Sequence, residues 1–155
     1  NFGVVPQTVS LFSGTVGENI TIGVDDYDEK FLVKVSEVSG VMSWLGRTPN
    51  GFDYKLSEGG KELSGGQRQT IAIARALIRK PHYIILDEPT ANMDTATEQL
   101  VLKNLAEYFK DETVLIVTHR MAPLSLVSRI VVLDNGKVNV DGPKEKILER
   151  LKGAA

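Results

Sequence analysis

The chain of 155 residues has no cysteine and only two histidines. Without cysteine there is no disulfide and no thiolate metal site, and two histidines are too few for a histidine-based zinc site. Its 18 lysines and arginines nearly balance its 20 aspartates and glutamates, so we expect no nucleic-acid partner. No apolar run is long enough to span a membrane, and the first residues lack the pattern of a secretory signal.

A phosphate-binding motif is also missing. The sequence contains no G-x-x-x-x-G-K-[ST], the Walker A or P-loop motif, whose backbone amides cradle nucleotide phosphates. Its two Gly-Lys pairs, Gly60-Lys61 and Gly136-Lys137, are not followed by Ser or Thr. Any phosphate chemistry in this chain therefore depends on other segments.

Apolar runs predict strands over residues 2–5, 83–86 and 113–117. The last two runs have no polar alternation, as expected of parallel strands covered on both faces. Asn135-Gly136 lies between two further apolar segments and predicts a hairpin with a type I′ turn.

Apolar residues at three- and four-residue spacing predict helices between these strands. The predicted ranges are 28–45, as one helix or two short ones, 64–79, 95–108 and 143–151. A helix that joins two parallel strands makes a βαβ unit, so the sequence predicts an α/β fold.

The segment Leu63-Ser64-Gly65-Gly66-Gln67 opens the second of these helices. Ser64 and Gln67 have the spacing of a capping box. A hydroxyl group and two amides without side chains, placed at a helix N-terminus, favour an anion such as a terminal phosphate. Alternatively, Ser64 only caps the helix and the glycines only allow a tight entry.

Two adjacent carboxylates, Asp87 and Glu88, end a strand predicted to be buried, where open α/β sheets bind ligands. Their desolvation is unfavourable unless a cation or a hydrogen-bond network meets them. A magnesium ion on nucleotide phosphates would do so, with Asp87 holding the ion and Glu88 deprotonating the attacking water. A polar strand exit broken by Pro89 is the structural alternative.

His119 and Gln7 each follow another predicted strand. The imidazole of His119 is able to hydrogen-bond a γ-phosphate, although a lone histidine is more often structural. The amide of Gln7 is suited to bind the metal or the attacking water. Each assignment is weak alone, and the order and spacing of the residues carry the argument.

In order along the chain, five segments resemble the nucleotide-binding domain of ATP-binding cassette (ABC) proteins. They are Val5-Pro6-Gln7, residues 63–67, residues 84–90, Asn92-Met93-Asp94 and Thr118-His119-Arg120. The resemblance implies an α/β, parallel-sheet P-loop NTPase-like core, incomplete here, with an inserted α-helical signature subdomain. The implied parts are 1–24 (glutamine-loop strand and coupling loop), 25–80 (helical signature subdomain) and 81–155 (C-terminal part of the ATPase core).

The same resemblance implies ATP and Mg²⁺ as cofactors and a role for each motif residue. The implied catalytic residues are Glu88 as general base, His119 as switch histidine and Gln7 as γ-phosphate sensor. The implied ATP-binding residues are Ser64, Gly65, Gly66, Gln67 and Asp94, and Asp94 also couples two sites. The implied metal ligands are Asp87 and Gln7. Alanine at position 91 departs from the serine common in the family's D-loop.

In this family ATP lies between the P-loop of one domain and the signature of a second, in a head-to-tail dimer. Since the chain has no P-loop, about 80 to 90 preceding residues are expected to be missing, judged from the usual size of such a domain. We expect the isolated chain to be catalytically silent. We also expect it to be marginally stable, or to bury an open sheet edge by self-association.

The stretch from Leu11 to Ile20 resembles the exporter form of this loop, which meets a transmembrane domain, and Glu58 is the second implied contact. Residues 123–146 resemble bacterial type I secretion exporters, which move proteins or peptides. The resemblance implies an exporter ATPase at the cytoplasmic face of the inner membrane. Two alternatives stay open: a soluble ABC ATPase acting on nucleic acid or ribosomes, and a non-catalytic subunit that supplies a signature half-site.

Overall fold

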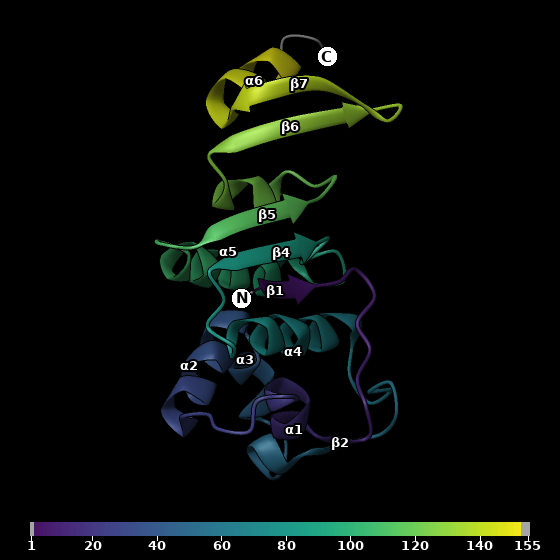
Figure 1. The fold of residues 1–155 in the computed structure, drawn as a ribbon. Coiled ribbons are helices and arrows are strands. Elements are labelled where there is room, and N and C mark those ends of the chain that lie inside the picture. The colour runs from purple at the N-terminus through teal and green to yellow at the C-terminus, as the bar shows by residue number, and fades with distance from the viewer. Residues whose placement is uncertain (1, 153–155) are drawn as a thin grey trace.

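The structure, a computed structural model, describes residues 2–152 (Figure 1). Its central sheet has three parallel strands in the order β1-β4-β5. They are β1 (Phe2–Val5), β4 (Tyr83–Asp87) and β5 (Thr113–Val117). Helix α5 (Thr95–Tyr108) is the crossover between β4 and β5. The predicted α/β fold and the predicted βαβ unit are therefore confirmed.

The chain between β1 and β4 is mainly helical. Its elements are β2 (Gly14–Thr15), α1 (Val16–Thr21), α2 (Glu29–Ser39), α3 (Met42–Leu45), the 3₁₀ helix η1 (Gly51–Asp53), β3 (Lys55–Leu56) and α4 (Gly65–Leu77). The predicted helix over 28–45 is two helices, because Gly40 adopts a left-handed φ of 86° and ends α2. Helix α4 ends two residues before the predicted end.

A second 3₁₀ helix, η2 (Ala122–Leu126), follows β5, and a hairpin follows it. The hairpin joins β6 (Arg129–Asp134) to β7 (Lys137–Pro143), and α6 (Lys144–Lys152) packs beside it (Figure 1). Both turn residues have positive φ, 48° at Asn135 and 74° at Gly136, as the predicted type I′ turn requires. Among residues 2–152, no helix combines the length and the apolar character needed to cross a membrane.

The hydrophobic core surrounds helix α4, which packs against one face of the sheet on one side and against helices α1 and α2 on the other. Ile71, Ile73 and Ala74 of α4 are fully buried, and they belong to one cluster with the inward-facing strand residues Val5, Ile84 and Leu86. Helix α5 adds Val101 and Leu105, both at 0% exposure. The signature segment (residues 63–67), which opens α4, is thus attached to a helix with nine buried residues.

The expectation that β4 and β5 are covered on both faces is wrong for the residues that the structure describes. Side chains on the second face are exposed, with 49% for Tyr83, 57% for Leu115 and 53% for Val117. The reason is that the described helices bury the alternate positions of these strands, such as Ile84 and Leu86, on one face only. The uncovered face is apolar rather than polar, although it meets solvent.

We expect Gly40→Ala to destabilise the fold strongly, because a Cβ at Gly40 would lie 2.8 Å from Cγ2 of Val101 in α5. The left-handed φ should lower the free energy of unfolding of the alanine variant by about 1–2 kcal/mol, and overpacking should lower it further by about 1–3 kcal/mol. Gly59→Ala is the control, since Gly59 also has a left-handed φ (78°) but no atom lies within 4 Å of its Cβ position. Urea unfolding of both variants measures the difference, and equal losses of stability would contradict the predicted clash.

Candidate functional site

The residues that follow the three parallel strands meet at one edge of the sheet. Val5 pairs with Leu86, and Leu86 pairs with Ile116, so the strands end level with one another. Gln7, Glu88 and His119 leave β1, β4 and β5 from this edge. Open α/β sheets bind ligands at the carboxyl ends of their strands. The structure therefore brings the three predicted strand-exit residues to one side of the molecule.

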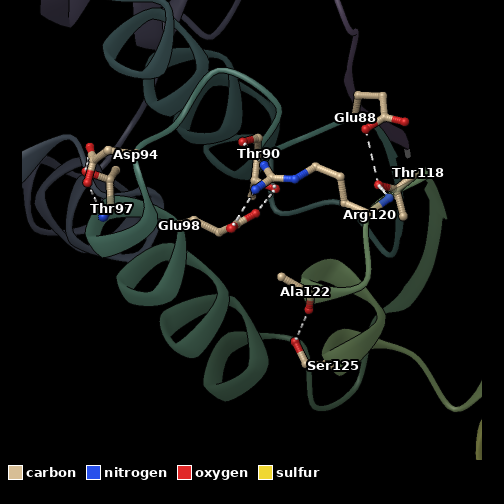
Figure 2. A network of polar contacts seen from close by, with 9 residues as sticks. All are labelled: Glu88, Thr90, Asp94, Thr97, Glu98, Thr118, Arg120, Ala122 and Ser125. Atoms are coloured by element: carbon tan, nitrogen blue, oxygen red, sulfur yellow. Dashed lines mark hydrogen bonds and ion pairs between the residues drawn. The ribbon is translucent and has the colours of Figure 1, made fainter.

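Glu88 and His119 are in direct contact. Nδ1 of His119 lies 2.6 Å from Oε1 of Glu88, and the His119 backbone amide donates to the same oxygen at 2.9 Å. The hydroxyl of Thr118 donates to Oε2 at 3.2 Å (Figure 2). A carboxylate only accepts, so the short ring contact requires a proton on Nδ1. The His119 side chain is 80% exposed, which leaves its second ring nitrogen open to a ligand.

Glu88 itself is 8% exposed, and two effects compete for its charge. Burial raises the pKa of the Glu88 carboxyl, but hydrogen bonds from the His119 side chain, the His119 amide and Thr118 together lower it by more. Glu88 is thus a carboxylate at neutral pH. Because this folded-state pKa lies below the unfolded value, the contribution of Glu88 to stability is present above the unfolded pKa and is lost as pH falls through the folded pKa.

The signature segment forms the predicted capping box. Oγ of Ser64 accepts from the Gln67 amide at 3.1 Å, and Oε1 of Gln67 accepts from the Ser64 amide at 2.8 Å. Both side chains are occupied as helix caps, as the structural alternative states. The amides of Gly65 and Gly66 lie in the first turn, where a helix leaves its N–H groups without internal partners. Because the side chains of Ser64 and Gln67 only accept in this box, the Ser64 O–H and the Gln67 NH2 remain available as donors to an anion, together with these amides.

Gly65 and Gly66 also allow the D-loop, residues 91–94, to approach the signature segment. A Cβ at Gly65 would lie 3.0 Å from Cβ of Asn92, and one at Gly66 would lie 2.9 Å from the Asn92 carbonyl oxygen. Any larger residue would push these segments apart. The close approach of the D-loop to the signature is therefore built into the sequence at positions 65 and 66.

Asp94 caps the N-terminus of α5. Its carboxylate accepts from the Thr97 amide at 3.0 Å and from the Thr97 hydroxyl at 2.6 Å (Figure 2). Hydrogen bonds from the Thr97 side chain and then its backbone lower the pKa of Asp94. The structure thus gives Asp94 a capping function, while its predicted ATP contact remains a prediction.

Gln7 lines a pocket of about 170 Å³ between the first strand exit, the signature and the D-loop. Its other lining residues are Thr8, Val9, Gly65, Arg68, Gln69 and Asn92. The amide of Gln69 is fully buried and has no hydrogen-bond partner among the described residues. No motif or spacing in the sequence singles out Gln69. Its burial depends on the packing of α4, which no local pattern reveals.

The donor set at this edge fits Mg²⁺ bound to a nucleotide. Within residues 2–152, no group of three or more histidine and acidic side chains is placed to hold a metal ion. The two predicted ligands, Asp87 and Gln7, each carry a single side-chain group with an oxygen of the kind Mg²⁺ prefers, and their role as ligands remains a prediction. Mg²⁺ is usually bound in this way, by one or two carboxylates together with phosphate oxygens and water.

The exporter-type loop is attached to α4 and to the segment that contains Glu58. Strand β2 pairs antiparallel with β3, and the Gly59 amide donates to the Leu11 carbonyl at 2.9 Å. From α4, Arg75 donates to the Ser10 carbonyl at 3.0 Å and to the Asn19 carbonyl at 2.8 Å. The two segments predicted to meet a transmembrane partner thus lie side by side.

Comparison with known proteins agrees with this geometry. The profile of the family described as "ABC transporter" matches residues 1–91. An ATP-dependent lipid A-core flippase of Desulfotalea psychrophila is 38% identical over 94% of this chain and 26% of its own length. A similar flippase of Haemophilus influenzae is 36% identical over 97% of this chain and 26% of its own length. The chain thus spans about a quarter of the length of these relatives.

A solved structure of a bacterial Atm1-family ABC exporter with ATP bound superposes on 99% of the chain, with a TM-score of 0.89 and 31% identity, and the match covers 29% of that protein. The chain belongs to the ABC transporter family. More narrowly, its fold is that of an ABC ATPase domain, which confirms the predicted P-loop NTPase-like architecture.

We expect His119→Ala to raise the pKa of Glu88, because it removes the ring donor and leaves the burial that acts in the opposite direction. Titration of the carboxyl ¹³C shift of Glu88 measures the change. Asp141 is the internal control, because Arg129 lowers its pKa in the hairpin, away from this site. An unchanged pKa of Glu88 would show that the hydrogen bond from the His119 imidazole does not stabilise the carboxylate.

Proposed function

We propose that this chain is part of the ATPase domain of an ABC exporter that couples ATP binding and hydrolysis to transport across the inner membrane. The observation that carries the proposal is the contact of Glu88 with His119 at the ends of β4 and β5. A buried, ionised carboxylate beside a largely exposed imidazole suits a site that activates water next to a phosphate.

In this proposal Glu88 is the general base and His119 contacts the γ-phosphate. Since Nδ1 of His119 faces Glu88, the nitrogen available for the phosphate is Nε2, which donates only when it carries a proton. Asp87 and Gln7 hold Mg²⁺, which neutralises charge on the phosphates when bound.

We propose that the signature segment binds the ATP held by a second nucleotide-binding domain, in a head-to-tail dimer. The Ser64 hydroxyl and the amides of Gly65 and Gly66 meet the γ-phosphate. The capping box of Ser64 and Gln67 fixes the helix terminus that presents them, and Gln67 adds its side-chain NH2 to the ATP-binding donors. Asp94, which caps α5 in the adjoining D-loop, couples the two sites.

The loop from residue 11 to 20, with Glu58 beside it, is the proposed contact with the transmembrane domain. Its attachment to α4 through Arg75 supports this assignment, because a contact at the loop then reaches the signature helix. We place the domain at the cytoplasmic face of the membrane, with parts 1–24, 25–80 and 81–155 as predicted. A protein or peptide substrate follows only from the resemblance of residues 123–146 to type I secretion exporters. The relatives described above are named as lipid A-core flippases and do not support that choice.

The uncovered apolar face of the sheet supports completion of the domain by further structure. A P-loop strand would pair at an edge of the sheet, its helix would cover that face, and the loop between them would supply the phosphate cradle. A soluble ABC ATPase and a half-site subunit remain the alternatives, and the exporter-type loop favours the exporter.

Glu88→Gln in the full-length protein is expected to lower the ATPase kcat by at least about 100-fold, as loss of a general base typically does, and to leave ATP binding intact. Steady-state hydrolysis and equilibrium nucleotide binding measure the two effects. Glu149→Gln on α6 is the control, because Glu149 is exposed and lies in the helix beside the hairpin. Unchanged hydrolysis in Glu88→Gln would refute the assignment of the general base.

The 155-residue chain on its own is expected to self-associate through its uncovered sheet face. Leu115→Glu places a charge on that face and should shift the chain towards the monomer in sedimentation velocity. Val33→Glu on α2 is the control, since Val33 is 38% exposed on another element. A strict monomer at all concentrations, with a sharp thermal transition, would contradict this prediction.

A further inference from the structure

Three side chains without a role so far close a hydrogen-bonded ring beside Glu88 (Figure 2). The Thr90 hydroxyl donates to Oε1 of Glu98 at 2.6 Å, and Nη2 of Arg120 donates to Oε2 of Glu98 at 2.9 Å. Nη1 of Arg120 closes the ring by donating to the Thr90 carbonyl at 2.6 Å. We call these residues the Thr90–Glu98–Arg120 ring.

Two members of the ring, Thr90 and Glu98, are buried, while the Arg120 side chain is 31% exposed. Thr90 is 1% exposed and Glu98 is 5% exposed, and both Glu98 oxygens receive a donor. A buried carboxylate is unfavourable unless it is paired and hydrogen-bonded, so removal of either partner leaves an uncompensated charge. The geometry of the ring is therefore strongly constrained.

Each member of the ring is close in sequence to a residue of the proposed site. Thr90 is two residues after Glu88, Arg120 directly follows His119, and Glu98 is in the first turn of the helix that Asp94 caps. Figure 2 shows Arg120 extending from the chain after β5 towards Thr90 and α5. The ring thus ties the segment after β4 and the segment after β5 to the first turn of α5.

The backbone at Glu88 needs such a restraint. Glu88 has a φ of 46°, a left-handed backbone conformation that residues other than glycine rarely adopt. Residues in this region keep their conformation only where the surroundings fix it, and such positions cluster at functional sites. The bond from Arg120 to the Thr90 carbonyl restrains the backbone two residues after Glu88.

We propose that Arg120 and Glu98 are positioning residues for ATP hydrolysis. The ring holds the segment after β4 against the segment after β5, and it thereby fixes the distance and orientation between Glu88 and His119. This inference rests on the proposed function, because it concerns the same hydrolytic site. It adds a structural requirement that lies outside the residues which touch ATP.

The test uses Arg120→Lys and Glu98→Gln in the full-length protein. Lysine cannot span the two acceptors that the guanidinium reaches, and the Glu98→Gln side chain would keep an oxygen for Thr90 but lose the charge. Since misplacement by 1 Å can cost about 100-fold, we expect each variant to lower kcat by about 10- to 100-fold. We expect KM to stay within about twofold of the unmodified value, because neither substitution removes a group that contacts ATP.

Two further comparisons make the test specific. Thr90→Ser keeps the hydroxyl, so its kcat should equal that of the unmodified protein. Thr90→Val removes the hydroxyl and should lower kcat as much as Arg120→Lys does. Arg129→Lys is the matched control, because Arg129 also binds a carboxylate through two bonds, to Asp141 at 2.8 Å each, but in the exposed hairpin. It should leave kcat unchanged.

A second readout needs no hydrolysis. The His119 amide is bonded to Glu88, so its hydrogen exchange in the nucleotide-free protein should quicken in Arg120→Lys and not in Arg129→Lys. Faster exchange confined to the segments after β4 and β5, with lower kcat, supports the inference. Two exchange results would overturn it: unchanged exchange of the His119 amide, or faster exchange throughout the protein. Two kinetic results would also overturn it: a kcat within about twofold of the unmodified value, or a rise in KM alone. If the unmodified protein does not hydrolyse ATP, the proposed function fails, and the exchange measurement still decides whether the ring positions the two segments.

Discussion

The parallel pairing of β4 with β1 on one side and β5 on the other is the constraint on which the candidate site depends. Parallel strands in register deliver their carboxyl ends to one edge, so groups more than a hundred positions apart in sequence, such as Gln7 and His119, leave the sheet together. The helices between the strands make this arrangement possible, and their burial keeps the register. Without the pairing, no local feature of the three exit segments would bring them together.

At that edge the structure resolves a competition between desolvation and hydrogen bonding. Glu88 and Glu98 are both buried carboxylates next to an apolar core, and both keep their charge compensated by donors from the chain after β5. Burial alone would favour the neutral form of Glu88, but three donors outweigh it. The exit of β4 is thus polar because of specific partners, whereas His119 at the exit of β5 is itself largely exposed to water.

Local patterns were enough to predict much of this fold, while contacts between distant segments were not. The hairpin follows from Asn135-Gly136, since two adjacent residues determine the turn, and α4 follows from its cap and its apolar spacing. Helix α1 escaped prediction although Thr15 and Glu18 form a capping box that the sequence displays. The uncovered sheet face was missed because an apolar run reports the preference of its side chains and not what covers them. The bonds of Arg120 join residues 22 and 30 positions apart, and no spacing rule reaches that far.

Arg75 gives the exporter-type loop a mechanical property. Its guanidinium binds carbonyls at both ends of the loop, and its backbone belongs to a helix whose other end is the signature segment. Ten residues of helix separate Arg75 from Gly65, about 15 Å at the usual rise. Because α4 is buried along most of this length, we expect a displacement of the loop to shift the helix as a unit rather than to bend it. A displacement at the protein surface would arrive at the glycine amides with little loss, as a shift in position and not as a change of shape.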